Sequence, residues 1–89
     1  MSTPRKPTEG SRALWRAVQR QYDGKPARLA AALGLDDAVV YRWISGERRP
    51  GLDAAIKLRN GAGVPVELWS EALPDWTPES EAPSSPEAA

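Results

Sequence analysis

The chain has 89 residues, of which 40% are hydrophobic, and its 12 Lys and Arg side chains balance 12 Asp and Glu; that length supports one small domain. The absence of Cys and His excludes disulfides, thiolate zinc sites and the commonest general base. With no apolar run of the ~20 residues that a membrane span needs and no secretory signal at the N-terminus, we expect a small cytoplasmic binding protein with no cofactor or metal, not an enzyme.

Charge is distributed unevenly along the chain. Residues 1–70 hold 12 basic and 7 acidic side chains, a net charge of +5, whereas residues 71–89 hold five acidic side chains and no base. Residues 1–10 are expected to form a flexible basic arm and residues 74–89 a disordered acidic tail rich in Pro, Ser and Glu. Trp76 is the one tail residue expected to be able to dock, and residues 11–73 are the predicted domain.

The first two helices are marked by their ends. Ser11 is the predicted N-cap of the first, which Asp23 and Gly24 stop. Pro26 suits the first position of the second helix, where its missing N–H has no intrahelical partner to lose, and Gly34 ends that helix. The predicted apolar faces are Leu14, Ala17 and Val18 in the first helix and Leu29, Ala30 and Leu33 in the second.

Three more short helices follow. Asp36 is the predicted cap of the third helix, and Gly46 suits a left-handed C-cap. The fourth follows the Pro50-Gly51 pair and is expected to break at Gly61 and Gly63. The predicted apolar positions are Val40, Trp43 and Ile44, then Leu52, Ala55 and Ile56, then Leu68, Trp69 and Leu73 in a fifth helix opened by Pro65. Since no segment alternates with period two, the predicted fold is an all-α bundle of four to five short helices.

The spacing around Gly34 satisfies the requirements of a helix-turn-helix. Ala30 is small enough for close approach of two helices, and Gly34 tolerates the positive φ that the turn needs. Val40 and Trp43 can hold the inner face of the following helix, which leaves its outer face exposed.

The sequence resembles a known family in these same segments. Residues 27–35 (ARLAAALGL) and 40–50 (VYRWISGERRP) are similar to the phage-repressor or Cro-type helix-turn-helix, a lambda-repressor-like group, and especially to YdaS-like regulators, which share the ending Trp-x-x-Gly-x-x-x-Pro. Residues 64–69 resemble the last helix of the family. The resemblance covers about residues 12–70 and implies a DNA-binding domain of five helices, commonly a homodimer on inverted-repeat operators.

The resemblance places the recognition helix at residues 36–45, in the major groove of double-stranded DNA. Its outward positions, assigned to base readout, are Asp37, Ala38, Tyr41 and Arg42. Arg42 can bond both guanine O6 and N7, and Ala38 can contact a thymine methyl. Asp36 is expected to act as a cap, while Asp37 either accepts from cytosine N4 or has only a solvated role in the first turn.

The other roles that the resemblance implies are contacts to the DNA backbone and to a second subunit. Contacts to phosphate are assigned to Lys25, Arg28, Ser45, Arg48 and Arg49. Trp69 and Leu73 are the candidate dimer surface. Pro26 departs from the family pattern, which often has Gln at this position. As a proline it has no backbone N–H to donate to a phosphate.

Alternatives remain at several positions. Trp15, Trp43 and Trp69 are interpreted as packing residues and not as base-stacking platforms. The stripe of Arg12, Arg16 and Arg20 is a solvated helix face or a nonspecific DNA contact, and Arg5-Lys6 is a solvated terminus or an arm around DNA. The second function hypothesis is a protein-interaction adaptor (antirepressor, antitoxin-like or assembly factor), motivated by the pI of about 6.2, by Asp36-Asp37, and by the acidic tail as a possible site for a protein partner.

Overall fold

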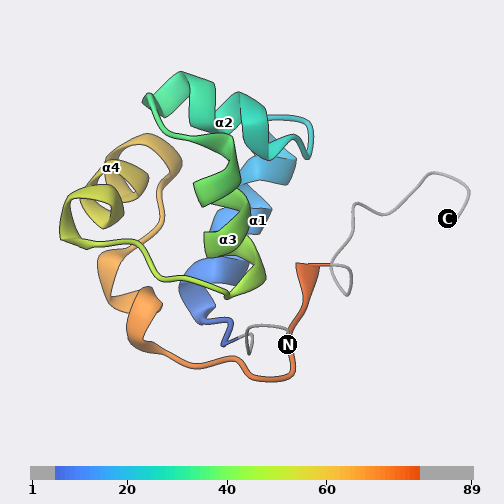
Figure 1. Cartoon of the computed structure of the whole chain (residues 1–89), viewed down its shortest axis with the longest axis vertical. Helices are drawn as coiled ribbons and strands as arrows, with labels where there is room; N and C mark the ends of the chain where they lie inside the picture. Colours follow the sequence, from blue (N-terminus) through green and yellow to red (C-terminus); the bar gives the residue numbers. More distant parts are fainter. Residues whose placement is uncertain (1–5, 79–89) are drawn as a thin grey trace, which may run out of the picture.

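The computed structural model describes residues 6–78 of the chain. They form helices α1 (Glu9–Gln21), α2 (Pro26–Leu33), α3 (Asp37–Ser45) and α4 (Leu52–Ala62), followed by the 3-10 helix η1 (Val66–Ser70) (Figure 1). Within these residues an isolated bridge pairs Thr8 with Ala72, and no named strand occurs. The predicted all-α bundle is confirmed. The expectations for residues 1–5, which include Arg5, and for residues 79–89 fall outside the described part of the chain.

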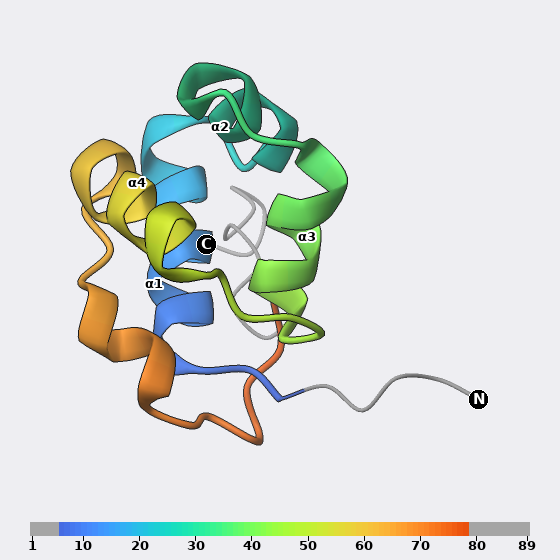
Figure 2. The same ribbon diagram turned by 60° about the vertical axis from the view of Figure 1, so that its left-hand side comes forward.

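Helix α1 is the centre of the bundle. It contacts α2, α3, α4 and η1, which surround it in Figures 1 and 2. Leu14, Ala17 and Val18 on its inner face are fully buried, as their i, i+3, i+4 spacing predicts. The other buried apolar side chains are Leu29, Ala30, Val40, Trp43, Ile44, Ala55, Leu58, Ala62, Val64, Trp69 and Trp76.

The ends of α2 and α3 follow the predicted signals. Pro26 occupies the first turn of α2, and Gly34 ends that helix in the left-handed region, with φ +71°. The Asp36 side chain caps α3 by accepting from the Ala38 N–H at 2.8 Å. Gly46 ends α3 with φ +87°, a conformation that costs glycine little because it has no Cβ.

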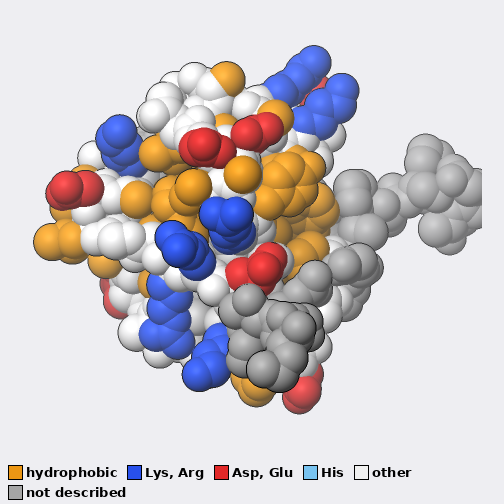
Figure 3. All heavy atoms as spheres, viewed as in Figure 1, with side chains coloured by type: hydrophobic (Ala, Val, Ile, Leu, Met, Phe, Trp, Pro, Cys, Tyr) orange, Lys and Arg blue, Asp and Glu red, His pale blue; other side chains and the backbone are white. Residues whose placement is uncertain are grey.

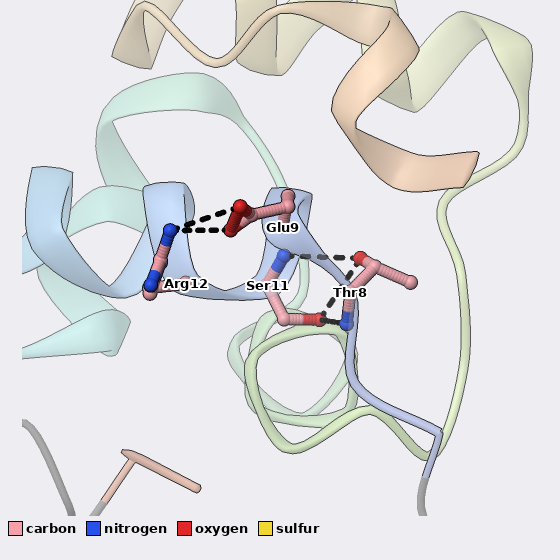
Figure 4. A network of polar contacts seen from close by, with 4 residues as sticks. All are labelled: Thr8, Glu9, Ser11 and Arg12. Carbon is pink, nitrogen blue, oxygen red and sulfur yellow. Dashed lines mark hydrogen bonds and ion pairs between the residues drawn. The ribbon is translucent and has the colours of Figure 1, made fainter. Parts of the chain in front are cut away.

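Helix α1 begins earlier than predicted. Its N-cap is Thr8, whose Oγ1 accepts from the Ser11 N–H at 3.2 Å, while the Ser11 Oγ accepts from the Thr8 N–H at 3.2 Å (Figure 4). The prediction of Ser11 as the cap is therefore wrong, because Ser11 lies at the third helical position and completes a reciprocal capping box. Ser11 also donates to the backbone oxygen of Trp43 at 2.8 Å, which ties α1 to α3.

Helix α4 differs from prediction at two positions. Gly61 does not break the helix, since it lies inside it and a Cβ there would collide with the Leu33 side chain of α2. The glycine thus permits close packing of α4 on α2. Leu52 is 71% exposed instead of buried, while Leu58 fills the core from the same helix.

The two ends of the described chain are packed against each other. Glu9 N–H donates to the Glu71 oxygen at 2.8 Å and Leu73 N–H to the Pro7 oxygen at 2.9 Å. Figure 2 shows these segments side by side below α1. Pro7 is buried, and Trp76 is 8% exposed. Residues 7–10 and Trp76 therefore pack against the body, although they lie in the segments expected to be an arm and a tail.

None of the helices between residues 6 and 78 has the length and apolar character to cross a membrane.

Candidate nucleic-acid interface

Helices α2 and α3 pack as a helix-turn-helix. Ala30 is buried at their contact, and the Leu35 N–H returns to the Ala30 oxygen at 2.7 Å, which closes the turn after Gly34. Val40 and Trp43 are 0% and 5% exposed. The inner face of α3 is therefore fixed against the bundle, and its opposite face is left for a ligand.

The outer face of α3 carries the four side chains predicted for base readout. Asp37, Ala38, Tyr41 and Arg42 are all exposed, and their i, i+1, i+4, i+5 spacing keeps them on one side of the helix. Tyr41 is 55% exposed, which is unusual for a large aromatic residue in a core-forming helix. The structure thus brings these four residues together on one surface.

Exposed basic side chains precede and follow the helix-turn-helix in the sequence. Lys25 and Arg28 are exposed at the start of α2, and Arg48 and Arg49 are exposed after α3. Figure 3 views the side of the molecule on which α3 lies: basic side chains gather near its centre, hydrophobic atoms lie beside them, and acidic side chains lie above and below. Only groups that are this accessible can approach phosphates on both sides of a groove.

Two of the predicted phosphate contacts already have partners within the chain. Arg28 Nη1 lies 3.2 Å from Asp23 Oδ2, with both side chains largely exposed. Ser45 is half-buried, and its single hydroxyl hydrogen has two acceptors within reach, the Arg42 oxygen at 3.2 Å and Glu47 Oε2 at 3.0 Å. The sequence analysis did not predict a role for Glu47. Its position two residues after Ser45 is the signal that could have indicated this hydrogen bond.

The acidic pair at the start of α3 serves the helix end. The Ala38 N–H donates to Asp36 Oδ1 at 2.8 Å and to Asp37 Oδ1 at 2.9 Å. Two carboxylates therefore satisfy one otherwise unpaired N–H of the first turn and suit the positive end of the helix dipole. The capping role of Asp36 is confirmed, whereas a base contact by Asp37 stays a prediction.

The helix-turn-helix geometry agrees with the comparison to known families. The family model described as Helix-turn-helix, of the Cro/C1 type, matches residues 21–69. The chain belongs to the Cro/C1-type helix-turn-helix family. The match spans α2, α3, α4 and most of η1 and supports a DNA-binding regulator. No curated protein and no solved structure matches the chain.

The tryptophans of this helix-turn-helix domain pack inside it. Trp43 and Trp69 are buried and Trp15 is half-buried, so their interpretation as packing residues is confirmed. The expectation of an exposed dimer surface at Trp69 is wrong. Its indole packs against Gly10 of α1 and is 6% exposed, because the 3-10 turn of η1 directs it inward. Leu73 is half-buried against the same core.

The C-terminal end of α3 is held by two contacts that the sequence did not predict. Ser11 donates to the Trp43 oxygen at 2.8 Å, and the Lys6 N–H donates to the Gly46 oxygen at 2.9 Å. These bonds join segments more than 30 residues apart, so no short sequence pattern predicts them. They fix the orientation of the surface that carries Tyr41 and Arg42.

No cluster of side chains able to hold a metal occurs among residues 6–78.

Proposed function

We propose that the chain is a sequence-specific transcriptional regulator, a repressor or Cro-like protein of the phage or mobile-element type, which places α3 in the major groove of DNA. The observation that carries this proposal is the exposure of Ala38, Tyr41 and Arg42 on one face of α3 while the opposite face is buried. A helix anchored in this way presents a rigid row of side chains to base edges.

Each side chain on the outer face suits a different contact. The Arg42 guanidinium can donate two parallel hydrogen bonds to guanine O6 and N7, the commonest specific contact in the major groove. Ala38 is small and apolar and suits a thymine methyl. Tyr41 carries a hydroxyl that can donate to a phosphate beside the groove. Arg42 is the principal determinant of sequence in this proposal.

Phosphate contacts orient the domain without selecting a sequence. Lys25 is the N-cap of α2, Arg48 and Arg49 follow three and four residues after the end of α3, and all three are exposed. In this proposal they contact phosphates beside the groove that α3 enters. Arg28 joins them by exchanging its exposed contact with Asp23 for a phosphate, which costs little because exposed ion pairs contribute only ~0–1 kcal/mol. Ser45 reaches a phosphate only by giving up Glu47.

Two copies are proposed to bind one operator. A single recognition helix covers one half-site, and useful affinity comes from a homodimer whose half-sites lie about one helical turn, ~34 Å, apart. The operator is then an inverted repeat.

The decisive experiment is selection from random duplexes by the full chain at two salt concentrations, with sequencing of the enriched pool. The proposal expects enrichment of an inverted repeat with a conserved guanine in each half, and affinity that falls steeply with salt because phosphate contacts release counterions. Enrichment of no sequence at either salt concentration would overturn the proposal and favour the adaptor hypothesis.

A further inference from the structure

A second charged surface lies on the outer face of α1. Arg12, Arg16 and Arg20 follow one another at intervals of four residues, which places them in a row along the helix. They line a pocket of about 250 Å³ together with Glu9, Ala13, Gly63 and Leu68. We call this the α1 pocket. None of its lining residues belongs to α2, to α3 or to the segment 46–51, so it is separate from the candidate nucleic-acid interface.

The α1 pocket is positively charged. Among the lining residues that the structure describes, Glu9 is the one acid beside three arginines, so these residues carry a net charge of +2. Glu9 is engaged by Arg12, whose Nη2 lies 2.6 Å from Oε1 and 2.9 Å from Oε2, as Figure 4 shows. Arg16 and Arg20 are exposed at the next two turns. Since guanidinium groups bind carboxylates through paired N–H donors, the pocket suits a ligand with several carboxylates.

Apolar atoms complete the lining. Ala13 and Leu68 are half-buried, and Gly63 contributes no side chain. The combination of a cationic row with small apolar residues suits an acidic peptide that also carries Ala and Pro, better than it suits a bare inorganic anion.

The chain itself contains such a peptide. Residues 79–89 (ESEAPSSPEAA) hold three glutamates and no base, with Ala and Pro between them. We propose that residues 79–89 bind the α1 pocket of the same chain through their glutamates. This inference does not depend on DNA binding.

The place where the chain returns to α1 supports binding within one chain. The Glu71 oxygen accepts from the N–H of Glu9, itself a pocket residue, at 2.8 Å, and Trp76 is buried in the body. The chain thus passes a pocket residue at Glu71, and residue 79 follows eight positions later. Arg20 lies ~16 Å along α1 from Glu9 at 1.5 Å per residue, and eleven residues can extend ~36 Å. Tethering over such a length gives a local concentration in the millimolar range.

Binding there has an electrostatic consequence for the reading surface. The three glutamates would be held by α1 and kept from Tyr41 and Arg42, so the acidic segment would not compete with DNA phosphates for Arg48 and Arg49. The α1 arginines would then be neutralised by the chain itself, and α3 with its flanking cations would be the main basic surface.

The test uses paramagnetic broadening in the full chain. Because the sequence has no Cys, Ala88→Cys provides one unique position for a nitroxide label. We expect the amide NMR signals of Ala13, Arg16 and Gly63 to lose most of their intensity at low salt. The signals of Ala38 and Arg42 should be unaffected. The broadening should disappear near 1 M salt, where the screening length falls to ~3 Å.

Two charge variants provide the matched comparison. Arg16→Gln combined with Arg20→Gln should abolish the broadening, and neither side chain is buried, so the fold is expected to persist. Arg48→Gln combined with Arg49→Gln removes the same charge from the other surface and should leave the broadening unchanged.

Three results would overturn the proposal. Broadening at Ala38 and Arg42 would place the segment on the reading surface, and broadening confined to residues near the label would show that it does not bind. Broadening between a labelled chain and a separate isotope-enriched chain would mean that the segment binds a second copy. All three are measured without DNA, so they are distinguishable from a failure of the proposed regulator function.

Discussion

Arg42 combines an exposed side chain with a backbone carbonyl that accepts hydrogen bonds at the end of α3. Its carbonyl oxygen accepts from the N–H groups of Gly46, Glu47 and Arg48 and from the Ser45 hydroxyl. The Arg42 carbonyl therefore takes part in the C-terminal turn of α3, while the guanidinium remains exposed. Because the backbone there is already ordered, only the rotamer freedom of the Arg42 side chain is lost on binding.

Replacing Arg42 by Ala should reduce sequence discrimination. We expect the preference for the selected operator over a scrambled duplex to fall by ~1–3 kcal/mol, the usual contribution of a bidentate contact to guanine. Fluorescence anisotropy with both duplexes measures the difference. Arg59→Ala on α4 is the control, since it removes one exposed positive charge outside the candidate interface. Equal loss for both duplexes in Arg42→Ala would assign Arg42 to phosphate binding.

Replacing Arg48 by Ala should act differently. Both duplexes should bind more weakly by a similar factor, and the slope of log affinity against log salt should become shallower by ~1, because one phosphate contact and its released counterion are lost. Titrations over a series of salt concentrations provide the slope. An unchanged slope would show that Arg48 does not contact a phosphate.

At the scale of elements, the two left-handed glycines bounding α2 and α3 face different surroundings. At Gly34 a Cβ would meet no atom within 4 Å, whereas at Gly46 it would lie 2.6 Å from the Cα of Pro7. Both residues have positive φ. The turn of the helix-turn-helix therefore depends on backbone conformation alone, but the end of α3 also depends on the close approach of the N-terminal segment.

The two glycines should respond unequally to alanine. Gly34→Ala should lower the free energy of unfolding by ~1–2 kcal/mol, the usual cost of a left-handed residue with a Cβ. Gly46→Ala should lower it further, since the Pro7 backbone must also move. Urea denaturation followed by tryptophan fluorescence measures both values. If the two variants were equally stable, the contact between Pro7 and Gly46 would have no energetic importance.

Helix ends could be predicted where the residues that determine them lie close together in the sequence. Pro26, Asp36 and Gly46 act on their own helix ends, so their signals can be recognised in a short window. The start of α1 was misplaced because Thr8 and Ser11 cap it together and Ser11 alone looked sufficient. The exposure of Leu52 and the inward direction of Trp69 depend on how α4 and η1 meet α1, which helical periodicity does not contain.

For the candidate site, the sequence predicted which side chains share the outer face of α3, because that follows from helical geometry once Val40 and Trp43 are placed in the core. It did not predict the bonds that fix α3, such as those from Ser11 and Lys6, since they join distant segments. It also did not identify the α1 pocket, whose Gly63 and Leu68 come from another part of the chain.

At the scale of the whole molecule, the segment after η1 belongs to the core. Trp76 is buried in the same cluster as Trp43 and Trp69, although the sequence after it contains no large apolar side chain. A domain of this size buries a limited apolar area, so each large side chain contributes a substantial share of its stability.

Removing the Trp76 indole should therefore destabilise the whole domain. Trp76→Ala should lower the free energy of unfolding by ~3 kcal/mol, near the lower end for a buried tryptophan. Leu52→Ala is the matched control, because Leu52 is 71% exposed and surface changes usually stay within ~0.5 kcal/mol. Thermal and urea unfolding monitored by circular dichroism measure both. A neutral Trp76→Ala variant would show that residues 74–78 are peripheral.

The pairing of residues 6–9 with residues 71–73 has a consequence for biosynthesis. The far end of α3 is held by Lys6 and Ser11, and the segment containing both is in turn clamped by Glu71 and Leu73. Helices α1, α2 and α3 are translated before residues 71–73. A nascent chain thus completes the brace around its recognition helix only when nearly all of the domain has left the exit tunnel.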